Sequence, residues 1–507
     1  MKSRTRTVDH LSYSLSHLAT QIPEARLVGA DLDVSGVASD SRLVKPGDIF
    51  AAMKGTHLDG HDFAHEAYIN GASSLLTSRK LPIDLPQLIV PSVRRVLGKV
   101  SSLVYGIPST KLNVIGITGT NGKTTTSYMI ENALEHAGIR SGLIGTIETK
   151  IAGQSVPALF TTPEAPSLQG SLAEMLRHDV EVAVMEVSSH GIDQHRIDGT
   201  LFELGIFTNL TAEHLDYHGT IEQYYATKAQ LFEPSRCKRA LVCVDDEWGL
   251  RLSHQVQTPV VTFGSTPLAD YHIEDIRITH DGTSFTLNGP DVHTEIFSPI
   301  VGACNAQNAA AAFLALHLLG LDTEAALAGI KSCQKVSGRF QRVELGQSME
   351  IIIDYAHTPG AIVSLIETAR SLRADNSEVY IVAGARGGRD RLKRPELGRA
   401  LAKANHVILT VDSPGDEDPV AIIEQLIAGT IDVPQGRISI VLDREKAIQL
   451  AIGSAGPDDT VLIVGRGHEK SLRIGNRKIL LDDVEAAKKA VEMLDLAGTQ
   501  ASAYASR

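Results

Sequence analysis

The sequence predicts an α/β protein that is built on parallel β-sheets and divided into three domains. The chain has 507 residues, and at about 100–200 residues per domain this length fits three domains. Short apolar runs alternate with helical patterns along most of the chain, which is typical of βαβ units with parallel strands. One glycine-rich segment also lies between a predicted strand and a predicted helix, where parallel sheets place their binding loops.

The composition narrows the class of protein. Hydrophobic residues make up 43% of the chain and charged residues 21%, as in an ordinary globular protein. The net charge of −12 and the aromatic share of 5% argue against a nucleic-acid partner, which needs a basic face or a stacking platform. The four cysteines lack metal-type spacing, and neither a signal peptide nor a run of about 20 apolar residues is found. We therefore expect a cytoplasmic protein with no membrane contact.

We predict domains at residues 1–107, 108–337 and 338–507. The first boundary follows the turn-forming segment Gly106–Ser109, which we interpret as a linker, and the second lies near Ser337–Arg339. In the middle domain the helical pattern covers Thr124–Ala137 and stops at Gly138. Apolar runs predict strands in the second and third domains at Leu112–Ile117, Val180–Val187, Leu204–Phe207, Ile351–Ile353, Val379–Val382, Val407–Val411, Ile438–Val441 and Val461–Val464.

The segment Gly116–Thr125 reads GITGTNGKTT and predicts a phosphate-binding loop. Its glycines let the backbone N–H groups face a phosphate, Lys123 supplies positive charge, and the Thr124 hydroxyl can bind Mg²⁺. It is not a strict Walker A motif, because Ile117 occupies the place of the first glycine. The residues predicted to contact a nucleotide here are Gly119, Thr120, Asn121, Gly122, Lys123, Thr124 and Thr125.

Three further residue types suit a metal-dependent site. Glu186 ends a predicted strand, where a carboxylate near a phosphate loop is a reasonable Mg²⁺ ligand. His214 belongs to a stretch that is rich in ligand-type side chains, just past an apolar strand. Lys228 lies on a predicted helix, and its position alone predicts only a solvated surface charge.

Taken in order, these motifs resemble the Mur ligase superfamily over nearly the whole chain, and its E-type members in particular. The resemblance implies an N-terminal UDP-binding α/β domain, a central P-loop parallel-sheet ATPase domain and a C-terminal Rossmann-like domain. Asp40–Arg42 and the His57–His61 loop resemble the UDP-binding module. The remaining motifs are the phosphate loop, Thr161–Glu164, Glu186–Gly191, Thr208–Leu210, His214–His218, Lys228, Gly302, Asn305–Asn308, Gly338-Arg339, Asp354–Pro359, Arg389-Asp390, Lys393–Pro395, Asp443-Arg444 and Gly465–Glu469.

The resemblance implies roles for individual residues. It implies ATP and Mg²⁺ as cofactors, with Thr124, Glu186 and His214 as metal ligands and Lys123 as a catalytic cation. Lys228 matches a lysine that is carbamylated to N6-carboxylysine and helps to place a second Mg²⁺. Further residues are expected around the nucleotide (Asn305, Arg339, Asp354, His357), the muramoyl peptide (Ser41, Thr161, Thr162, Ser188, Arg196) and the amino acid (Asp412, Ser413, Gly415, Gly465, Glu469).

The implied reaction joins an amino acid to UDP-N-acetylmuramoyl-L-alanyl-D-glutamate in peptidoglycan synthesis. ATP converts the D-glutamyl carboxylate into an acyl phosphate, and the incoming amine displaces phosphate. Lys123 and two Mg²⁺ ions offset the charge of the two anionic partners. We expect a monomer in which ATP lies between the central and C-terminal domains and in which these domains close during turnover.

The chain departs from the family pattern where the amino acid is chosen. Diaminopimelate-adding members usually show Asp-Asn-Pro-Arg, but this chain has Asp412–Gly415, and glycine cannot bind a distal carboxylate. The acidic run Asp416–Asp418 favours a terminal ammonium, so we predict L-lysine or a similar diamino acid, with meso-diaminopimelate as the alternative. A second departure is Arg386 in the glycine loop Gly384–Asp390, which is either a phosphate contact or a surface residue.

Other hypotheses remain open from the sequence. A folylpolyglutamate-synthase-like or cyanophycin-synthetase-like ligase shares the phosphate loop and the lysine, but Thr161–Glu164 and Asp40–Arg42 argue against it. A divergent paralogue with an unusual amino acid is a further hypothesis. A nucleotide-gated regulatory protein without ligase activity is the candidate from another class, and the intact Lys123, Glu186, His214 and Lys228 argue against it.

Overall fold

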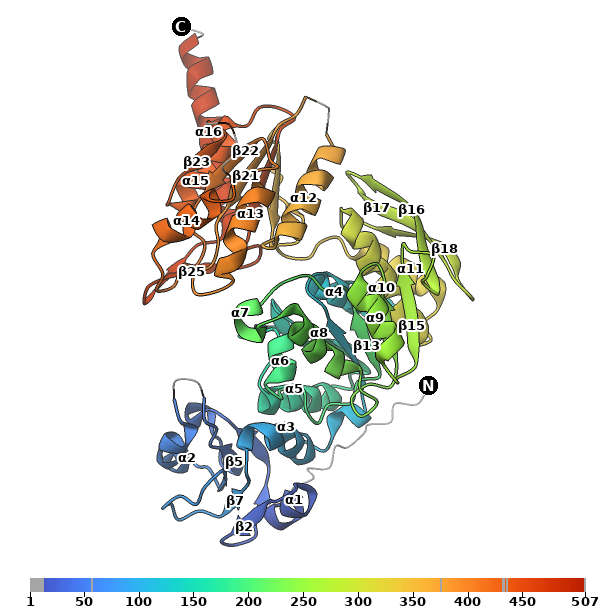
Figure 1. Ribbon diagram of the computed structural model, residues 1–507, viewed down its shortest axis with the longest axis vertical. Helices are drawn as coiled ribbons and strands as arrows, with labels where there is room; N and C mark the ends of the chain where they lie inside the picture. The colour runs from blue at the N-terminus through green and yellow to red at the C-terminus, as the bar shows by residue number, and fades with distance from the viewer. Residues whose placement is uncertain (1–12, 56–57, 374–375, 431–433, 435, 506–507) are drawn as a thin grey trace.

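The computed structural model describes residues 13–55, 58–373, 376–430, 434 and 436–505, and these form three consecutive lobes (Figure 1). The lobes follow one another along the long axis, from blue at the N-terminus through green to orange and red. Among these residues we find no helix with the length and apolar character that a membrane span requires. His57, which the sequence analysis grouped with His61, lies outside the described residues.

The N-terminal lobe is a five-stranded sheet. Val34, Leu76 and Leu88 are among the residues of its main core, onto which helix α3 (Val93–Val104) packs. The opposite face is covered by the short helix α2 (Ala64–Ile69). Along the sheet the strands are β2 (Arg26–Val28), β7 (Gln87–Ile89), β6 (Ser74–Thr77), β5 (Asp48–Ala51) and β4 (Gly36–Ala38), parallel except for β2.

The central lobe contains an eleven-stranded sheet. Successive residues of a strand point to opposite faces, so Ile115 and Ile117 enter one core while Val114 enters the other. Its strands in spatial order are β11 (Gln154–Pro157), β10 (Glu148–Ile151), β9 (Ser141–Ile144), β12 (Val182–Glu186), β8 (Asn113–Thr118), β13 (Leu204–Phe207), β14 (Ala240–Cys243), β15 (Val260–Gly264), β16 (Tyr271–Thr279), β17 (Gly282–Asn288) and β18 (His293–Ser298).

Helices cover both faces of this sheet, as expected for a doubly wound α/β fold. The first core is closed by α4 (Lys123–His136), α10 (Ala303–Leu318) and α11 (Thr323–Ser332). The second is closed by α5 (Ala165–Arg177), α8 (Ile221–Ala229) and α9 (Glu247–Gln255). The short helices α6 (Ser189–Asp193) and α7 (Leu215–His218) follow β12 and β13.

The C-terminal lobe is a six-stranded sheet with helices on both faces. One face carries α12 (Pro359–Ser371), α13 (Arg394–Leu401) and α14 (Pro419–Ile427), and the other carries α15 (Arg444–Ser454) and α16 (Asp483–Ala505). The strands in order are β19 (Gln341–Arg342), β20 (Glu350–Asp354), β24 (Thr460–Val464), β21 (Val379–Ala383), β22 (His406–Leu409) and β23 (Ile438–Ile440). A hairpin of β25 (Ser471–Ile474) and β26 (Arg477–Leu480) lies apart from this sheet.

The structure confirms each predicted strand and the predicted helix to within a few residues, and it corrects one expectation. The sheets are parallel only in their interiors, because antiparallel strands such as β10, β11 and β16–β18 extend the edges. The segment Gly106–Ser109, which we interpret as a linker, has a defined conformation. Ile107 adopts a left-handed backbone, and the buried Ser109 hydroxyl accepts a hydrogen bond of 3.0 Å from the Leu201 amide.

Candidate active site

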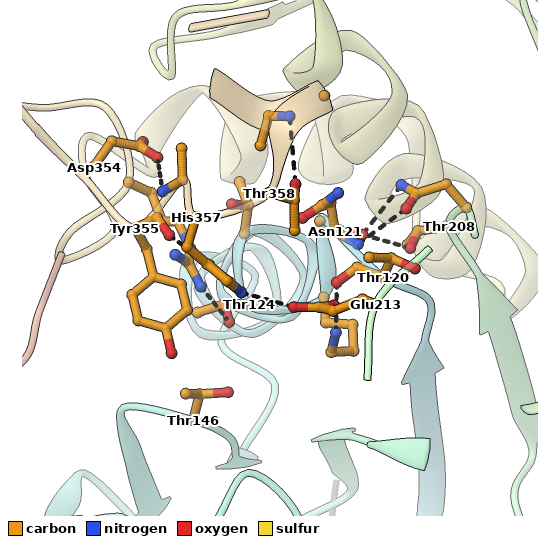
Figure 2. A pocket seen from close by; sticks show the side chains of 18 of the residues that line it. Thr120, Asn121, Thr124, Thr146, Thr208, Glu213, Asp354, Tyr355, His357 and Thr358 are labelled. Carbon is orange, nitrogen blue, oxygen red and sulfur yellow. Dashed lines mark hydrogen bonds and ion pairs between the residues drawn. The ribbon is translucent and has the colours of Figure 1, made fainter. Parts of the chain in front are cut away.

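A cavity of about 650 Å³ lies between the central and C-terminal lobes (Figure 2). Its central wall is formed by the loops after β8, β12 and β13 and by the start of α10, and its other wall by the loops after β20 and β21. These loops follow the carboxyl ends of parallel strands, where α/β proteins bind their ligands.

The predicted phosphate loop forms part of this cavity and opens α4. Gly119 and Gly122 have φ angles of +145° and +89°, and a Cβ atom on Gly119 would lie 2.0 Å from the Thr208 hydroxyl. The amides of Thr120 and Asn121 bind the Asn209 carbonyl and side-chain oxygens, each at 2.9 Å. Asn209 therefore holds the loop in place. The first N–H groups of α4 have no partner within the helix and can bind an anion.

Lys123 folds back over the loop. Its ammonium donates to the carbonyl oxygens of Gly119 at 2.8 Å and Thr120 at 2.9 Å. Burial lowers the pKa of Lys123, whereas the nearby carboxylates of Glu213 and Glu186 act to raise it. An anionic ligand in the cavity would favour the charged form of this lysine for the same reason.

Glu186 lies at the end of β12 and is completely buried. Its carboxylate accepts hydrogen bonds from the Thr124 hydroxyl at 2.9 Å and from the Thr146 amide and hydroxyl at 2.8 and 3.0 Å. The structure thus places two of the predicted metal ligands, Thr124 and Glu186, in direct contact.

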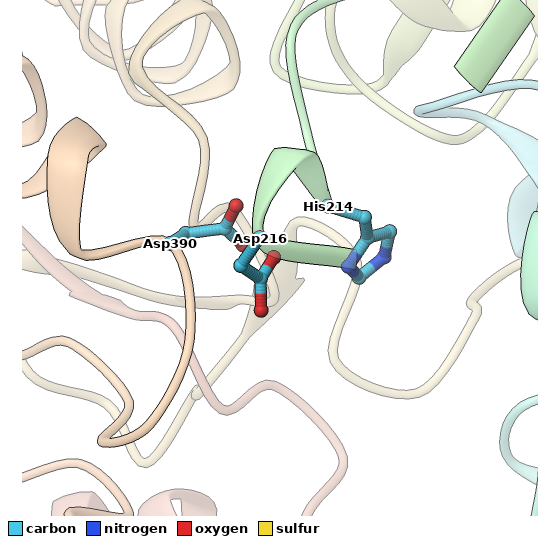
Figure 3. Close-up of side chains that lie close together, drawn as sticks. All are labelled: His214, Asp216 and Asp390. Carbon is cyan, nitrogen blue, oxygen red and sulfur yellow. The ribbon is translucent and has the colours of Figure 1, made fainter. Parts of the chain in front are cut away.

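His214 meets two carboxylates at the edge of the cavity. One ligand atom from each of His214, Asp216 and Asp390 lies within 4.8 Å of the others (Figure 3). Asp390 comes from the C-terminal lobe, so the group forms only where the lobes meet. Burial lowers the pKa of His214 to about 3, which leaves its imidazole neutral and able to bind a metal near pH 7.

Lys228 is 1% exposed, so the surface charge that its helix position predicts is wrong. Its ammonium donates to the Gly119 carbonyl at 2.9 Å and lies 4.6 Å from the centre of the Tyr224 ring. Burial lowers its pKa far below the usual value, and the charge of Lys123 lowers it further. A helix that buries Tyr224, Tyr225 and Lys228 together leaves this side chain no route to solvent.

The residues predicted to hold the muramoyl peptide lie together on the central wall, with the exception of Ser41. The Thr162 hydroxyl donates to the Glu186 carbonyl at 2.9 Å, and the Thr162 carbonyl accepts from Arg196 at 2.9 Å. The Ser188 amide donates to the Thr162 hydroxyl at 2.9 Å, and Thr161 lies beside Thr146 at 3.0 Å. Ser41 lies in the N-terminal lobe and donates to Glu66 at 2.7 Å, so it does not line this cavity.

One carboxylate joins this wall to the N-terminal lobe. Glu164 binds Arg196 at 3.1 Å with one oxygen and Arg94, on α3, at 2.6 Å with the other. Arg196 also lies over the Phe160 ring, 4.8 Å from its centre. The guanidinium of Arg196 is therefore held by both a charge and a ring before any ligand binds.

The predicted nucleotide residues of the C-terminal wall face the phosphate loop. Arg339 donates to the Thr124 hydroxyl at 3.2 Å, and His357 pairs with Glu213 at 2.7 Å. Burial acts to raise the pKa of Glu213, but the hydrogen bond with His357 and the nearby charge of Lys123 help to lower it well below its usual range. Asp354 lines the cavity and accepts from the Ala356 amide at 2.7 Å, and Asn305 lines it at the start of α10.

Of the residues predicted to hold the amino acid, Asp412 lines the cavity. Gly465 and Glu469 lie close behind the wall: a Cβ on Gly465 would lie 3.1 Å from Asp412, and Glu469 pairs with Arg386. Ser413 and Gly415 belong to the loop that Asp412 begins, and they do not line the cavity.

Some cavity residues were not assigned a contact from the sequence, and among them are Glu213, Tyr355, Arg386 and Asp390. Tyr355 could have been found from its place between two predicted residues, Asp354 and His357. Its ring centre lies 4.4 Å from the Arg339 guanidinium and 5.8 Å from that of Arg386, so it supports two cations of the wall.

Comparisons with known proteins agree with this architecture. Residues 33–104 match the model of the Mur ligase family catalytic domain, residues 117–316 the Mur ligase middle domain, and residues 338–467 the Mur ligase glutamate ligase domain. A relative from Streptomyces avermitilis, named UDP-N-acetylmuramoyl-L-alanyl-D-glutamate–2,6-diaminopimelate ligase, is 39% identical over 91% of this chain and 93% of its own. A relative of the same name from Geobacillus kaustophilus is 39% identical over 92% of this chain and 96% of its own.

Solved structures give the same result. A structure of a UDP-N-acetylmuramoyl-L-alanyl-D-glutamate–2,6-diaminopimelate ligase has a TM-score of 0.66 and 30% identity, covering 96% of this chain and 100% of that one. The MurF ligase of Thermotoga maritima, solved with ADP, has a TM-score of 0.65 and 22% identity, covering 86% of this chain and 94% of its own. At 22% identity, the likeness to the MurF ligase shows a shared fold and nothing more. The three family models and the two relatives together show that the chain belongs to the Mur ligase family.

Proposed function

We propose that this protein forms an amide bond between the D-glutamyl carboxylate of UDP-N-acetylmuramoyl-L-alanyl-D-glutamate and a diamino acid, driven by ATP. The observation that carries the proposal is the meeting of Lys123, Glu186, His214 and Lys228 around one phosphate loop. The names of the relatives support the same acceptor. In the proposed division, the domain of residues 1–107 binds the sugar nucleotide and that of residues 108–337 binds ATP. The domain of residues 338–507 binds the amino acid.

ATP would bind at the phosphate loop of residues 119–125, with its phosphates toward the start of α4. Lys123 would turn from the Gly119 and Thr120 carbonyls, which it contacts at 2.8 and 2.9 Å, toward the phosphates. Arg339 already reaches Thr124 from the other wall and adds a second cation. Asn305, Asp354 and His357 would surround the rest of the nucleotide.

The donor set fits Mg²⁺. Thr124 and Glu186 offer oxygen atoms in mutual contact at 2.9 Å, and His214 offers a neutral imidazole. When bound, Mg²⁺ offsets the charge of the phosphates during transfer. Thr124, Glu186 and His214, together with a carbamate on Lys228, would hold it.

Lys228 suits carbamylation because a neutral amine is the form that attacks carbon dioxide. Burial and Lys123 lower the pKa of Lys228, and no carboxylate pairs with it among the described residues. The Lys228 nitrogen would form a bond to the carbon of CO₂ and release one proton, giving an anionic carbamate. The carbamate would place anionic oxygen donors near the phosphate loop, where a bound Mg²⁺ would offset their charge.

In the proposed reaction a D-glutamyl carboxylate oxygen attacks the γ-phosphorus of ATP, and ADP leaves. The amine of the diamino acid then attacks the acyl carbon, phosphate leaves, and the amine gives up a proton. Arg196, Thr161, Thr162 and Ser188 would orient the muramoyl peptide from the central wall, while Ser41 would contact its nucleotide end in the N-terminal lobe. Lys123 and Arg339 would stabilise the charge that develops.

One experiment separates this proposal from its rivals. The protein is incubated with ATP, Mg²⁺, UDP-muramoyl dipeptide and a panel of diamino acids, and products are identified by mass. We expect ADP, phosphate and a UDP-muramoyl tripeptide in equal amounts. ATP hydrolysis that responds to folate and glutamate, and not to the muramoyl dipeptide, would favour a folylpolyglutamate-synthase-like ligase. Nucleotide binding without any new amide would favour a regulatory protein.

A further inference from the structure

Thr146 lines the cavity between the carboxylate of Glu186 and the wall that is proposed to hold the muramoyl peptide (Figure 2). Its amide donates to one oxygen of Glu186 at 2.8 Å, and its hydroxyl donates to the other at 3.0 Å. The same hydroxyl lies 3.0 Å from that of Thr161. One side chain thus contacts both a proposed metal ligand and a proposed substrate contact, although the sequence analysis gave it no role.

The backbone around Thr146 is held in place by its neighbours. A hydrogen bond of 3.0 Å from the Gly145 amide to the Glu148 carbonyl closes the turn between β9 and β10. A Cβ atom on Gly145 would lie 2.6 Å from a Glu186 oxygen, so a larger residue there would displace the carboxylate. The Glu148 carboxylate accepts from the Tyr128 hydroxyl of α4 at 2.6 Å. The turn is therefore tied to the helix that follows the phosphate loop.

The direction of these hydrogen bonds follows from what each group can donate. An ionised carboxylate only accepts, so the Thr146 hydroxyl directs its single proton to Glu186. Its oxygen then accepts the proton of Thr161, which leaves Thr161 with lone pairs and no free proton. In this state Thr161 can accept from an N–H group of a ligand, but it cannot donate to a carboxylate.

A second hydroxyl donates to the same carboxylate oxygen. Thr124 reaches this oxygen of Glu186 at 2.9 Å, so two protons already lie on it. A cation that binds there competes with these protons for the lone pairs. Thr124 can bind the same cation through a lone pair and keep its proton on Glu186. Thr146 is the hydroxyl with another acceptor, because the Thr161 oxygen lies 3.0 Å away.

We infer that Thr146 is a positioning residue that couples the binding of Mg²⁺ at Glu186 to the binding of the muramoyl peptide at Thr161. This inference rests on the proposed function. With the cation in place, Thr146 turns its proton to the Thr161 oxygen, and the proton of Thr161 becomes free for a carboxylate of the peptide. Both hydroxyls only rotate, so no covalent bond forms or breaks. Coupling is reciprocal, so the peptide tightens the binding of the cation by the same factor.

The neighbouring Thr162 does not provide this link. Its hydroxyl donates to the backbone carbonyl of Glu186 at 2.9 Å and accepts from the Ser188 amide at 2.9 Å. A cation on the carboxylate leaves both of these partners unchanged, so the Thr162 proton has no reason to turn. The coupling therefore depends on Thr146 and Thr161.

The test measures binding and needs no turnover. The dissociation constant of UDP-muramoyl dipeptide is measured by calorimetry with a non-hydrolysable ATP analogue, once with Mg²⁺ and once with EDTA. We expect Mg²⁺ to tighten the binding by about fivefold or more in the unaltered protein. Thr146→Val keeps the shape of the side chain and removes the hydroxyl, so it should reduce this factor by at least about threefold. Thr146→Ser keeps the hydroxyl and should keep the factor.

Thr149→Val is the matched control for the same substitution. Thr149 is half-buried on β10, three residues further along, and does not line the cavity. We expect this variant to keep the full effect of Mg²⁺. A second measurement follows Mn²⁺ binding by electron paramagnetic resonance, with and without the dipeptide. The dipeptide should tighten Mn²⁺ binding in the unaltered protein and do so less in Thr146→Val, by a similar factor.

The outcomes separate this inference from the function on which it rests. An unchanged effect of Mg²⁺ in Thr146→Val overturns the inference alone, and so does an equal loss in Thr146→Ser and Thr146→Val. Absence of dipeptide binding to the unaltered protein, with and without Mg²⁺, overturns the proposed function. If melting temperatures show that Thr146→Val does not fold, Thr161→Val tests the other end of the link. That variant should show the same reduction, because it removes the proton that the cation frees.

Discussion

Lys123 and Lys228 donate hydrogen bonds to the same carbonyl oxygen, that of Gly119, at 2.8 and 2.9 Å. Like charges that share one acceptor repel each other, and the charge of Lys123 adds to burial in lowering the pKa of Lys228. Lys228 is the more affected, since its pKa is lowered far below the usual value. The phosphate loop therefore has a reactive amine beside it as well as a phosphate-binding cation.

This pairing leads to a prediction about carbon dioxide. Activity should fall by at least about tenfold in buffer depleted of CO₂ and return when bicarbonate is added, because the carbamate supplies metal ligands. Lys228→Gln should lack activity under both conditions. Initial rates of phosphate release, with and without bicarbonate, check this. Equal rates in both buffers for the unaltered protein would contradict carbamylation.

Replacement of Glu186 by glutamine should weaken metal binding. The buried carboxylate contacts Thr124 at 2.9 Å, and an amide removes one anionic oxygen from the donor set. We expect the Mg²⁺ concentration for half-maximal rate to rise by about 10–100-fold. Mg²⁺ titration of ADP formation is the measurement. Glu203→Gln, which alters a pair with Lys238 away from the cavity, should leave the titration unchanged.

The pair of Glu213 and His357 at 2.7 Å joins the two walls of the cavity, so its removal should impair closure. We expect Glu213→Gln and His357→Asn each to lower kcat/KM for ATP by about tenfold. The double variant should be no worse than the poorer single variant, because both changes break one contact. Additive losses in this cycle would show that the two residues act separately.

His468 gives the stability of the protein a pH dependence. Burial, Arg339 and Arg386 lower its pKa to about 4, from the ordinary histidine value of 6.5 that applies to the unfolded chain. The unfolded chain then binds more protons between these values, so stability is full above about pH 6.5 and falls as the pH drops toward 4. His468→Gln should remove this acid-dependent loss of stability, which amounts to about 1–2 kcal/mol near pH 5. Chemical denaturation at about pH 7.5 and pH 5 compares the variant with the unaltered protein. If the variant and the unaltered protein differed by the same free energy of unfolding at both pH values, His468 would not be the source of the pH dependence.

Arg444 and Asp483 form a pair at 2.7 Å in which both side chains are fully buried. Asp483→Asn would leave a buried guanidinium without its anion, which costs about 3–5 kcal/mol. We expect a lower unfolding midpoint for the C-terminal lobe, measured by urea denaturation or hydrogen exchange. Asp482→Asn, at the neighbouring half-buried position that caps α16 through the Val484 amide, should cost far less.

Much of the site was predictable because its signals are local. The glycine spacing around Lys123 and the carboxylate at the end of a buried strand need only a few neighbouring residues to be interpreted. The contact between Arg386 and Glu469, which are 83 positions apart, depends on how two loops pack and has no local signal. The antiparallel strand β16 was missed because its alternation is weak: its residues from Glu274 to Thr279 are all exposed or only partly buried.

Lys228 illustrates a different limit. Its residue type alone assigned this lysine to solvent, although Ile221, Tyr224 and Lys228 have the i, i+3, i+7 spacing of one helix face. Its burial comes from the phosphate loop lying across the helix, a contact between residues 109 positions apart. Only the family resemblance marked the residue, and that resemblance did not predict that Lys123 would share its acceptor.

Glu164 holds Arg94 of the first lobe and Arg196 of the central wall with its two oxygens. Glu164 directly precedes α5, so a shift of α3 against α5 would strain the ion pairs of Glu164 with Arg94 and Arg196. Docking of the uridine end of the muramoyl substrate against the first lobe would therefore change the position of Arg196, which is proposed to hold the peptide end. A muramoyl peptide without its nucleotide would then lose alignment at the reacting carboxylate as well as binding energy.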